Sequence, residues 1–202
     1  VQKLITPLNS TKIAIVGKYL DIGDFQLQDS YISIKEALKH AGAHNNTKIE
    51  ISWIDSKEFE QNPESIEKLK KFNGIIIPGG FGNSGVEGKI QTIKFCRENN
   101  IPFLGLCLGL QLAVVEYARN ICKLDAHSTE MSPNTPAPVI DILPEQKTIT
   151  EKGGTMRLGA YKAILKPGTK TNQIYNSTEV SERHRHRYEV NPDYHKILQE
   201  HN

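Results

Sequence analysis

One cysteine stands where nucleophilic chemistry is favoured. Cys107 lies between Gly105 and Gly109, with an apolar run before it and a helical pattern after it. Flanking glycines permit the sharp strand-to-helix turn called a nucleophile elbow, which exposes its central side chain at the carboxyl edge of a parallel sheet. A helix N-terminus beside the sulfur favours the thiolate. We therefore predict that Cys107 is a nucleophile, although a free cysteine is more commonly a small buried hydrophobe.

A glycine-rich segment, Pro78-Gly79-Gly80-Phe81-Gly82, follows the preceding apolar run and supplies backbone N–H groups near the cysteine. A tetrahedral intermediate on sulfur needs donors for its oxyanion. The amides of Gly80 and Leu108 are the expected pair. A simple tight turn is the plainer interpretation, and a nucleotide-phosphate cradle fits poorly because the G-x-x-x-x-G-K-[ST] spacing is missing.

The other two cysteines, Cys96 and Cys122, have no such setting, and we expect both to be buried hydrophobes. Three cysteines without C-x-x-C spacing fit neither a disulfide framework nor a zinc site. This usage is typical of a reducing, cytoplasmic location.

The composition is that of an ordinary globular domain. The chain has 202 residues, 38% of them hydrophobic and 24% charged, and its net charge is +2. Such a balance gives no reason to expect nucleic acid or an acidic membrane surface as a partner. No run of 18 apolar residues is present, and the first residues lack a signal-peptide pattern.

Strand and helix patterns alternate along the first 120 residues, which predicts an α/β fold with an open, mostly parallel central sheet and helices on both faces. Expected strands are 12–16, 49–54, 74–78 and 102–106. Expected helices run from Asp29 or Ser30 to Gly42, from Pro63 past Lys70, from Val86 to Asn99 and from Leu108 to Asn120.

The pattern fails from Lys123 to Gly154, where four prolines stand at 133, 136, 138 and 144. Strands are expected again at 161–165 and 183–190, and a helix at 193–200.

The last strand carries the basic run Arg183-His184-Arg185-His186-Arg187, whose arginines should share one face and whose histidines should share the other. A solvated or interdomain face is the plain interpretation. A metal site at His184-x-His186 is disfavoured because flanking arginines oppose a cation.

These motifs together resemble the class I glutamine amidotransferases. The glycine-rich loop and the Gly105-x-Cys107-x-Gly109 elbow carry that likeness. Further blocks resemble the branch of the family that makes CTP from UTP: 85–90, 111–114, 116–120, Ser128-Thr129-Glu130, Gly153-Gly154-Thr155-Met156-Arg157-Leu158-Gly159 and 182–191. The resemblance covers about Lys12 to Asn191 and implies the flavodoxin-like fold of the family.

The resemblance also implies roles. Cys107 attacks the amide of L-glutamine, releases ammonia and leaves a glutamyl thioester, while the amides of Gly80 and Leu108 hold the oxyanion. The substrate-binding set implied for this chain is Gly80, Phe81, Leu108, Gly109, Leu110, Gln111, Glu130 and Arg187. Within it, Glu130 pairs with the substrate ammonium and Phe81 lines the pocket. Arg187 is our choice for the carboxylate, because a guanidinium can bind one through two hydrogen bonds.

The partners implied by the resemblance lie mostly outside these residues. A synthetase domain before Val1, which uses ATP and Mg to aminate UTP, is expected, as is a homotetramer built mainly by that domain. No cofactor is expected in residues 1–202 themselves, and GTP is the allosteric activator of the branch. Ser84 stands where relatives commonly carry arginine, which weakens the expectation that GTP acts here in the usual way.

The catalytic histidine and glutamate of the family come from a late His-Pro-Glu motif, and this sequence contains no His-x-Glu. His195 and His201 do not match that motif, and His127 stands where relatives often carry asparagine. Residues 1–202 are therefore expected to be an amidotransferase domain that lacks its C-terminal part.

Two alternatives stay open. One is another cysteine γ-glutamyl hydrolase of the same fold, against which the CTP-branch blocks argue. The other is a degenerate, non-catalytic amidotransferase domain, which the intact elbow and Glu130 oppose and the absent histidine and glutamate permit.

Overall fold

The computed structural model describes residues 7–18, 21–22, 25–26, 31–143 and 157–201. The chain divides into two compact units. The first comprises residues up to Ile140 together with Val190 and the residues after it, and the second runs from Asp141 to Glu189. All of the elements around Cys107 belong to the first unit.

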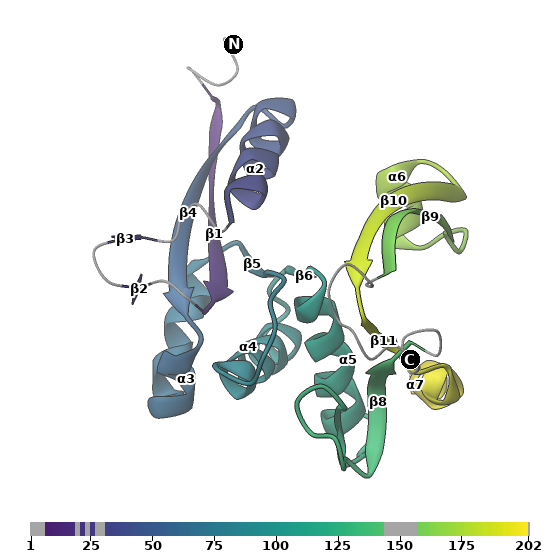
Figure 1. The fold of residues 1–202 in the computed structure, drawn as a ribbon. Coiled ribbons are helices and arrows are strands. Elements are labelled where there is room, and N and C mark those ends of the chain that lie inside the picture. The colour runs from purple at the N-terminus through teal and green to yellow at the C-terminus, as the bar shows by residue number, and fades with distance from the viewer. Residues whose placement is uncertain (1–6, 19–20, 23–24, 27–30, 144–156, 202) are drawn as a thin grey trace. The chain divides into compact units, whose positions relative to one another are not determined.

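A parallel sheet forms the centre of the first unit (Figure 1). Its strands are β1 (Asn9–Gly17), β4 (Thr47–Asp55), β5 (Gly74–Ile77) and β6 (Phe103–Gly105), in the order β4-β1-β5-β6. Ile15 lies beside Trp53 on one side and Ile76 on the other, and Ile77 lies beside Gly105. The sheet and its order confirm the fold class predicted from the sequence.

Continuous apolar runs explain why β1 and β5 are the inner strands of this sheet. Every residue of β5 is buried, as are Ala14, Ile15 and Val16 of β1. A strand covered on both faces has no polar face, so its sequence does not alternate. The carboxyl ends of all four strands meet at one edge of the sheet.

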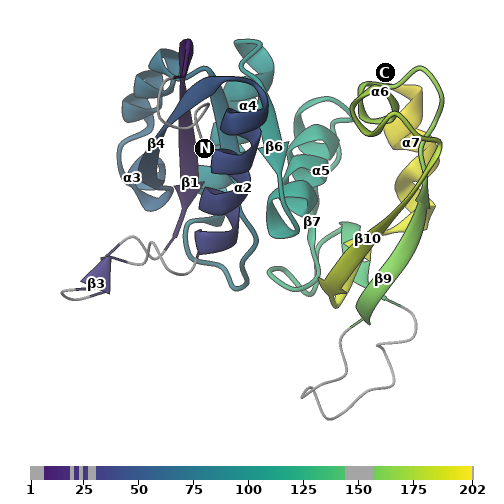
Figure 2. The same ribbon diagram turned by 90° about the horizontal axis from the view of Figure 1, so that it is seen from above.

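The helices that cover this sheet are α2 (Ile32–His44), α4 (Val86–Glu98) and α5 (Leu108–Asn120). Helix α2 contacts β4, and α4 packs against α5, as both ribbon views show (Figures 1 and 2). The chain passes from β1 outward to β4, then returns past β1 to β5 and β6. Right-handed crossovers in opposite directions place helices on opposite faces and create a topological switch point at the carboxyl edge.

Short elements complete the first unit. They are β2 (Asp21–Ile22), β3 (Phe25–Gln26), α3 (Lys57–Gln61), the 3-10 helices η2 (Pro63–Lys71) and η4 (Pro192–Tyr194), β7 (Ala126–Ser128) and α7 (His195–Glu200). Strands β8 (Ala137–Ile142) and β11 (Tyr188–Val190) cross the unit boundary and join β7 in the order β11-β8-β7. The second unit holds the antiparallel pair β9 (Arg157–Ile164) and β10 (Glu179–His186), with α6 (Lys170–Tyr175) between them in sequence.

Several expectations need correction. Helix α2 continues through Gly42 to His44, and its expected caps Asp29 and Ser30 lie outside the described residues. The segment after Pro63 is a 3-10 helix, and β7 and β8 lie in the stretch expected to be irregular. Strand β8 pairs with β11, which is distant along the chain, so the local pattern could not reveal this sheet. The expected strand 183–190 breaks at Arg187.

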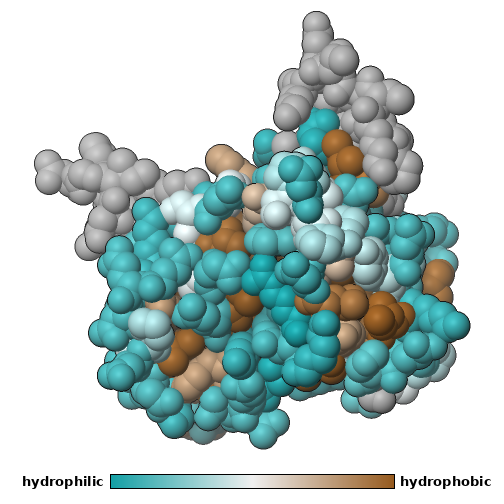
Figure 3. Space-filling model, turned by 90° about the horizontal axis from the view of Figure 1, so that it is seen from below, coloured by the Kyte–Doolittle hydropathy of each residue, from teal (hydrophilic) through white to brown (hydrophobic). Residues whose placement is uncertain are grey.

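No helix in the described ranges is long and apolar enough to cross a membrane. The face drawn in Figure 3 is mostly hydrophilic, with smaller apolar areas between.

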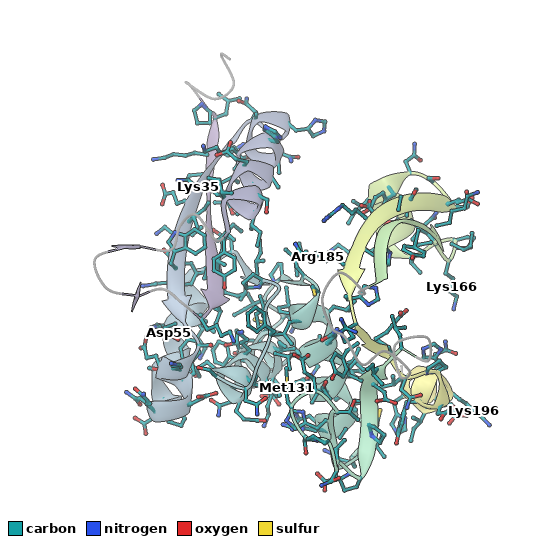
Figure 4. The ribbon with its side chains drawn as sticks, viewed as in Figure 1. Lys35, Asp55, Met131, Lys166, Arg185 and Lys196 are labelled. Carbon is teal, nitrogen blue, oxygen red and sulfur yellow. The ribbon has the colours of Figure 1, made fainter. Side chains whose placement is uncertain are left out.

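Two buried lysines lie at the carboxyl edge of the sheet. Lys18 follows β1 and is 4% exposed, and Lys89 of α4 is 1% exposed. Burial, aided by the charge of Lys18, lowers the pKa of Lys89 from 10.5 to about 8, although Asp55 and Glu60 act in the opposite direction. Asp55 stands at the end of β4 (Figure 4). Between pH 8 and 10.5 the unfolded chain therefore binds a proton at Lys89 that the folded chain has lost.

This difference predicts how stability depends on pH. Below pH 8 the folded protein carries a buried charge at Lys89, and its stability recovers as the pH rises through the window from about 8 to 10.5. A Lys89→Met variant should therefore be more stable than the parent at pH 7, and this advantage should shrink across that window. At about 1.4 kcal/mol per pKa unit, the change amounts to a few kcal/mol at most.

Thermal unfolding measured from pH 7 to 10.5 tests this expectation. Lys48→Met, which removes an exposed ammonium, controls for the loss of one positive charge. If the stability difference between Lys89→Met and the parent stays constant from pH 7 to 10.5, then the pKa of Lys89 is not lowered in the folded protein.

Candidate active site

Cys107 lies in the elbow between β6 and α5. Its φ is 52°, a left-handed conformation that is rare for a residue with a Cβ. The turn is held on both sides: Leu106 N–H donates to the Ile77 carbonyl at 2.9 Å, and the Cys107 carbonyl accepts from Gln111 N–H at 3.1 Å. The strained backbone leaves the side chain exposed. This geometry matches a nucleophile elbow.

The two flanking glycines are required by packing. A Cβ on Gly105 would lie 2.5 Å from the Gly109 carbonyl carbon, and one on Gly109 would lie 2.2 Å from the Ile77 carbonyl oxygen. Both distances are shorter than real Cβ atoms tolerate. The first turn of α5 therefore lies directly on the end of β5, and only glycine permits that approach.

The glycine-rich loop 78–82 follows β5 and lies beside the elbow. A Cβ on Gly79 would be 3.4 Å from Cys107 Cβ and 3.9 Å from its Sγ. A Cβ on Gly80 would be 3.4 Å from the Leu108 side chain. The Leu108 N–H lies close enough to the thiol to lower its pKa. The structure thus brings together Gly80, Leu108 and Cys107, the three residues whose chemistry the sequence predicted.

The helix N-terminus does not by itself lower the pKa of the Cys107 thiol below its ordinary value, although we had expected that it would. Desolvation raises the pKa of Cys107, the Leu108 N–H lowers it, and the charge of Glu130 raises it further. A single backbone donor at the helix N-terminus is outweighed by crowding and by a nearby carboxylate. Glu130 is therefore close enough to Cys107 for its charge to act on the sulfur.

Glu130 is held in a tight turn after β7. Ser128, fully buried, organises this turn: its Oγ accepts from Glu130 N–H at 3.2 Å, and its carbonyl accepts from Met131 N–H at 3.1 Å. Thr129 N–H donates to the Ile140 carbonyl at 3.0 Å, which ties the turn to β8. Met131 in Figure 4 marks this turn. These hydrogen bonds fix the backbone of the turn that carries the half-buried Glu130 side chain.

The remaining members of the expected substrate set lie around the elbow. Gln111 is buried in the first turn of α5, and Gly109 is the close-packed residue described above. Leu110 and Phe81 are large apolar side chains left 54% and 69% exposed. Exposed apolar groups beside an exposed nucleophile are suited to lining a pocket, so these assignments remain predictions that the geometry permits.

Arg187 belongs to the second unit and is buried at the bend between β10 and β11. It does not share the strand face of Arg183 and Arg185, which are exposed on β10 (Figure 4). The opposite face carries the half-buried His184 and His186, whose Nδ1 and Nε2 atoms lie 3.0 Å apart. The role of Arg187 toward a substrate carboxylate stays a prediction.

His127 is the histidine closest in sequence to Glu130, and its ring is already engaged. Its Nδ1 accepts from Ser128 N–H at 2.8 Å, and its Nε2 lies 3.8 Å from a Glu87 carboxylate oxygen. Arg119 binds the same carboxylate at 3.0 Å. Desolvation, helped by Arg119, lowers the pKa of His127. A ring with its lone pair occupied is a poor general base, which agrees with our decision not to assign it that role.

Cys96 and Cys122 are buried, and burial raises the pKa of both thiols, to about 12 for Cys96. Neither shares the setting of Cys107. In the ranges that the structure describes, no group of three histidine, cysteine or acidic side chains could hold a metal ion.

Comparison with known proteins agrees with this geometry. The family model described as "Glutamine amidotransferase class-I" matches residues 26–201. A solved chain, the glutaminase domain of Trypanosoma brucei CTP synthase (CTPS) with bound acivicin, superposes with a TM-score of 0.84 at 37% identity. The match covers 94% of this chain and 72% of that one.

The chain belongs to the class I glutamine amidotransferases.

Within the class I amidotransferases, its relatives are CTP synthases. That of Methanocaldococcus jannaschii is 56% identical over 207 residues, covering 100% of this chain and 37% of the relative. That of Sulfolobus acidocaldarius is 56% identical over 200 residues, covering 98% and 37%. The chain thus spans a little over a third of these relatives, and the part it matches is a glutaminase domain of the CTP synthase type.

One residue near the site was missed by sequence reasoning. Lys18 directly follows β1 at the carboxyl edge, and its ammonium donates to the Phe81 carbonyl in the 78–82 loop. A lysine immediately after a buried strand was the available signal, since polar residues at that edge of a parallel sheet face the ligand site.

The electrostatic link between Glu130 and the thiol gives a prediction. Since the carboxylate charge raises the pKa of Cys107, Glu130→Gln should lower that pKa and speed alkylation at neutral pH when no substrate is present. The pH dependence of iodoacetamide labelling at Cys107 measures this. Glu87→Gln removes a carboxylate of the same type that pairs with Arg119 and serves as the matched control. An unchanged labelling profile for Glu130→Gln would show that the carboxylate does not act on the sulfur.

The packing of the elbow gives a second prediction. Gly109→Ala forces a methyl group into the Ile77 carbonyl and should destabilise the fold by at least the roughly 1–3 kcal/mol that overpacking usually costs. Gly74→Ala is the control, because its new methyl meets the flexible end of Ile13 at 3.1 Å and Pro102 only at ordinary contact distances of 3.6 and 3.9 Å. Chemical denaturation should rank Gly109→Ala well below Gly74→Ala. Equal stabilities would mean that α5 can move away from β5 freely.

Proposed function

We propose that this domain hydrolyses L-glutamine to glutamate and ammonia through a thioester on Cys107. The observation that carries the proposal is the strained, exposed Cys107 held against the 78–82 loop, with the Glu130 charge acting on its sulfur. Family membership and the match to a solved glutaminase domain support the same reaction.

The reaction begins with attack of the Cys107 thiolate on the side-chain amide carbon of glutamine. The carbonyl oxygen then carries negative charge, which the amides of Gly80 and Leu108 stabilise. Such preorganised donors are typically worth about a hundred- to a thousand-fold in rate. The tetrahedral intermediate collapses as the C–N bond breaks, the nitrogen takes up a proton, and ammonia leaves. Water then attacks the thioester and frees glutamate and the thiol.

Substrate binding supplies the activation that the resting thiol lacks. Desolvation is the largest cause of the raised pKa of Cys107, and the charge of Glu130 adds to it. The ammonium group of glutamine would pair with Glu130 and remove this second contribution, which shifts the thiol toward the thiolate when substrate is in place. Arg187 receives the substrate carboxylate, Gln111 contributes a polar contact, and Gly109, Leu110 and Phe81 line the pocket.

Proton transfer needs a general base, and we propose that it comes from a histidine and glutamate that are not among residues 1–202. The engaged ring of His127 supports this assignment. General acid–base help is typically worth about a hundred- to ten-thousand-fold, so the missing pair matters for turnover.

We further propose that the complete protein is a CTP synthase. Its synthetase domain would use ATP and Mg to aminate UTP with the ammonia released here, in a cytoplasmic homotetramer. GTP remains the proposed activator, with Ser84 as the point at which this chain departs from the usual GTP response. The identity to curated CTP synthases over their glutaminase part supports this assignment.

Replacing the nucleophile tests the proposal. In the complete enzyme, Cys107→Ala should abolish glutamine-dependent CTP formation and leave activity with supplied ammonia intact, since Cys107 serves only ammonia release. Both activities are followed by CTP formation from UTP. Cys96→Ala removes a buried thiol outside the site and is the matched control. Loss of both activities in folded Cys107→Ala, or retention of both, would refute the role of Cys107, and absence of CTP formation in the parent would refute the whole-protein assignment.

A further inference from the structure

The 78–82 loop rests on the side chain of Lys18. This lysine is 4% exposed, and its ammonium donates a hydrogen bond to the Phe81 carbonyl. Its Nζ lies 3.6 Å from the position that a Cβ on Gly82 would take, and its Cε lies 4.0 Å from that of Gly80. The lysine therefore runs along the loop that carries the Gly80 amide.

The ring of Phe81 adds a second contact, since the Lys18 ammonium lies 5.1 Å from its centroid. A cation at this distance from an aromatic ring is attracted to its face. One side chain thus holds both the backbone and the ring of Phe81.

Lys18 is fixed in turn by its own surroundings. The Tyr31 hydroxyl donates to the Lys18 carbonyl at 3.1 Å, and the Tyr31 ring stacks on Trp53 with centroids 5.8 Å apart and planes at 20°. Trp53 belongs to β4, and Tyr31 stands at the start of α2. Packed side chains thus connect the 78–82 loop, through Lys18 and Tyr31, to strand β4 of the sheet.

The contacts to the loop depend on the charged end of Lys18. An apolar side chain of the same length could fill the space that Lys18 occupies. It could not donate the hydrogen bond to the Phe81 carbonyl or present a cation to the Phe81 ring.

We propose that Lys18 is a positioning residue for the oxyanion site: by holding the Phe81 carbonyl it sets the orientation of the 78–82 loop and hence of the Gly80 N–H. The proposal rests on the glutaminase function of Cys107. A misplacement of about 1 Å at a reacting centre can cost on the order of a hundred-fold in rate. Lys18 needs no contact with substrate to have such an effect.

The test uses Lys18→Met in the complete enzyme. We expect kcat for glutamine hydrolysis to fall by roughly ten- to a hundred-fold, with KM for glutamine nearly unchanged and ammonia-dependent synthesis retained. Lys18→Arg keeps the positive donor and should recover part of the loss. Lys68→Met is the matched control, because that ammonium also pairs with a neighbour, Glu58, and lies 5.3 Å from the ring centroid of Phe59, away from the loop.

A milder variant, Tyr31→Phe, removes only the hydroxyl that holds the Lys18 carbonyl. It should lower kcat in the same direction by a smaller factor, and its effect should largely disappear when combined with Lys18→Met. This variant keeps the test decisive if Lys18→Met does not fold.

The outcomes separate the two proposals. If the parent enzyme releases no ammonia through Cys107, the proposed glutaminase function fails. If the parent is active but Lys18→Met keeps its kcat, loses glutamine and ammonia activities equally, or changes only KM, then Lys18 does not position the oxyanion site. If Lys18→Met cannot be prepared, an unchanged kcat in Tyr31→Phe would overturn the proposal.

Discussion

The close approach of α5 to the end of β5 is the contact on which the site depends. The helix begins against the Ile77 carbonyl, with no room for a side chain at Gly109 or Gly105. This contact forces the backbone at Cys107 into a left-handed conformation, and that conformation turns the thiol outward. It also sets the elbow against the loop that follows β5. The proposed nucleophile and the proposed oxyanion donors are therefore positioned by the same packing contact.

The charge of Glu130 adds to desolvation in raising the pKa of the resting Cys107 thiol. The ammonium groups of Lys18 and Lys89 are both buried and close enough for their charges to interact. A protein selected only for stability would avoid buried charges of this kind. Under the function proposed above, the Glu130 carboxylate would serve to bind the substrate ammonium, and the Lys18 ammonium would serve to hold the loop that carries an oxyanion donor.

Much of this was readable from residue types and spacing. Continuous apolar runs identified the buried parallel strands, and glycines flanking Cys107 identified the elbow, because each pattern has a local steric cause. Local patterns did not predict the strands that form only by pairing with other segments of the chain. Strands β7 and β8 form only through pairing with each other and with β11. The break at Arg187 likewise depends on how β11 joins that sheet.

The sequence by itself determined the fold class, the sharp turn at Cys107 and the loop that faces it, since these depend on steric limits of a few neighbouring residues. Only the tertiary structure decided the state of the thiol and the place of Lys18. A pKa depends on charges and desolvation brought by segments far along the chain, here Glu130 for Cys107. The Lys18 contact joins residues 63 positions apart, at the ends of two adjacent strands, and no local periodicity records it.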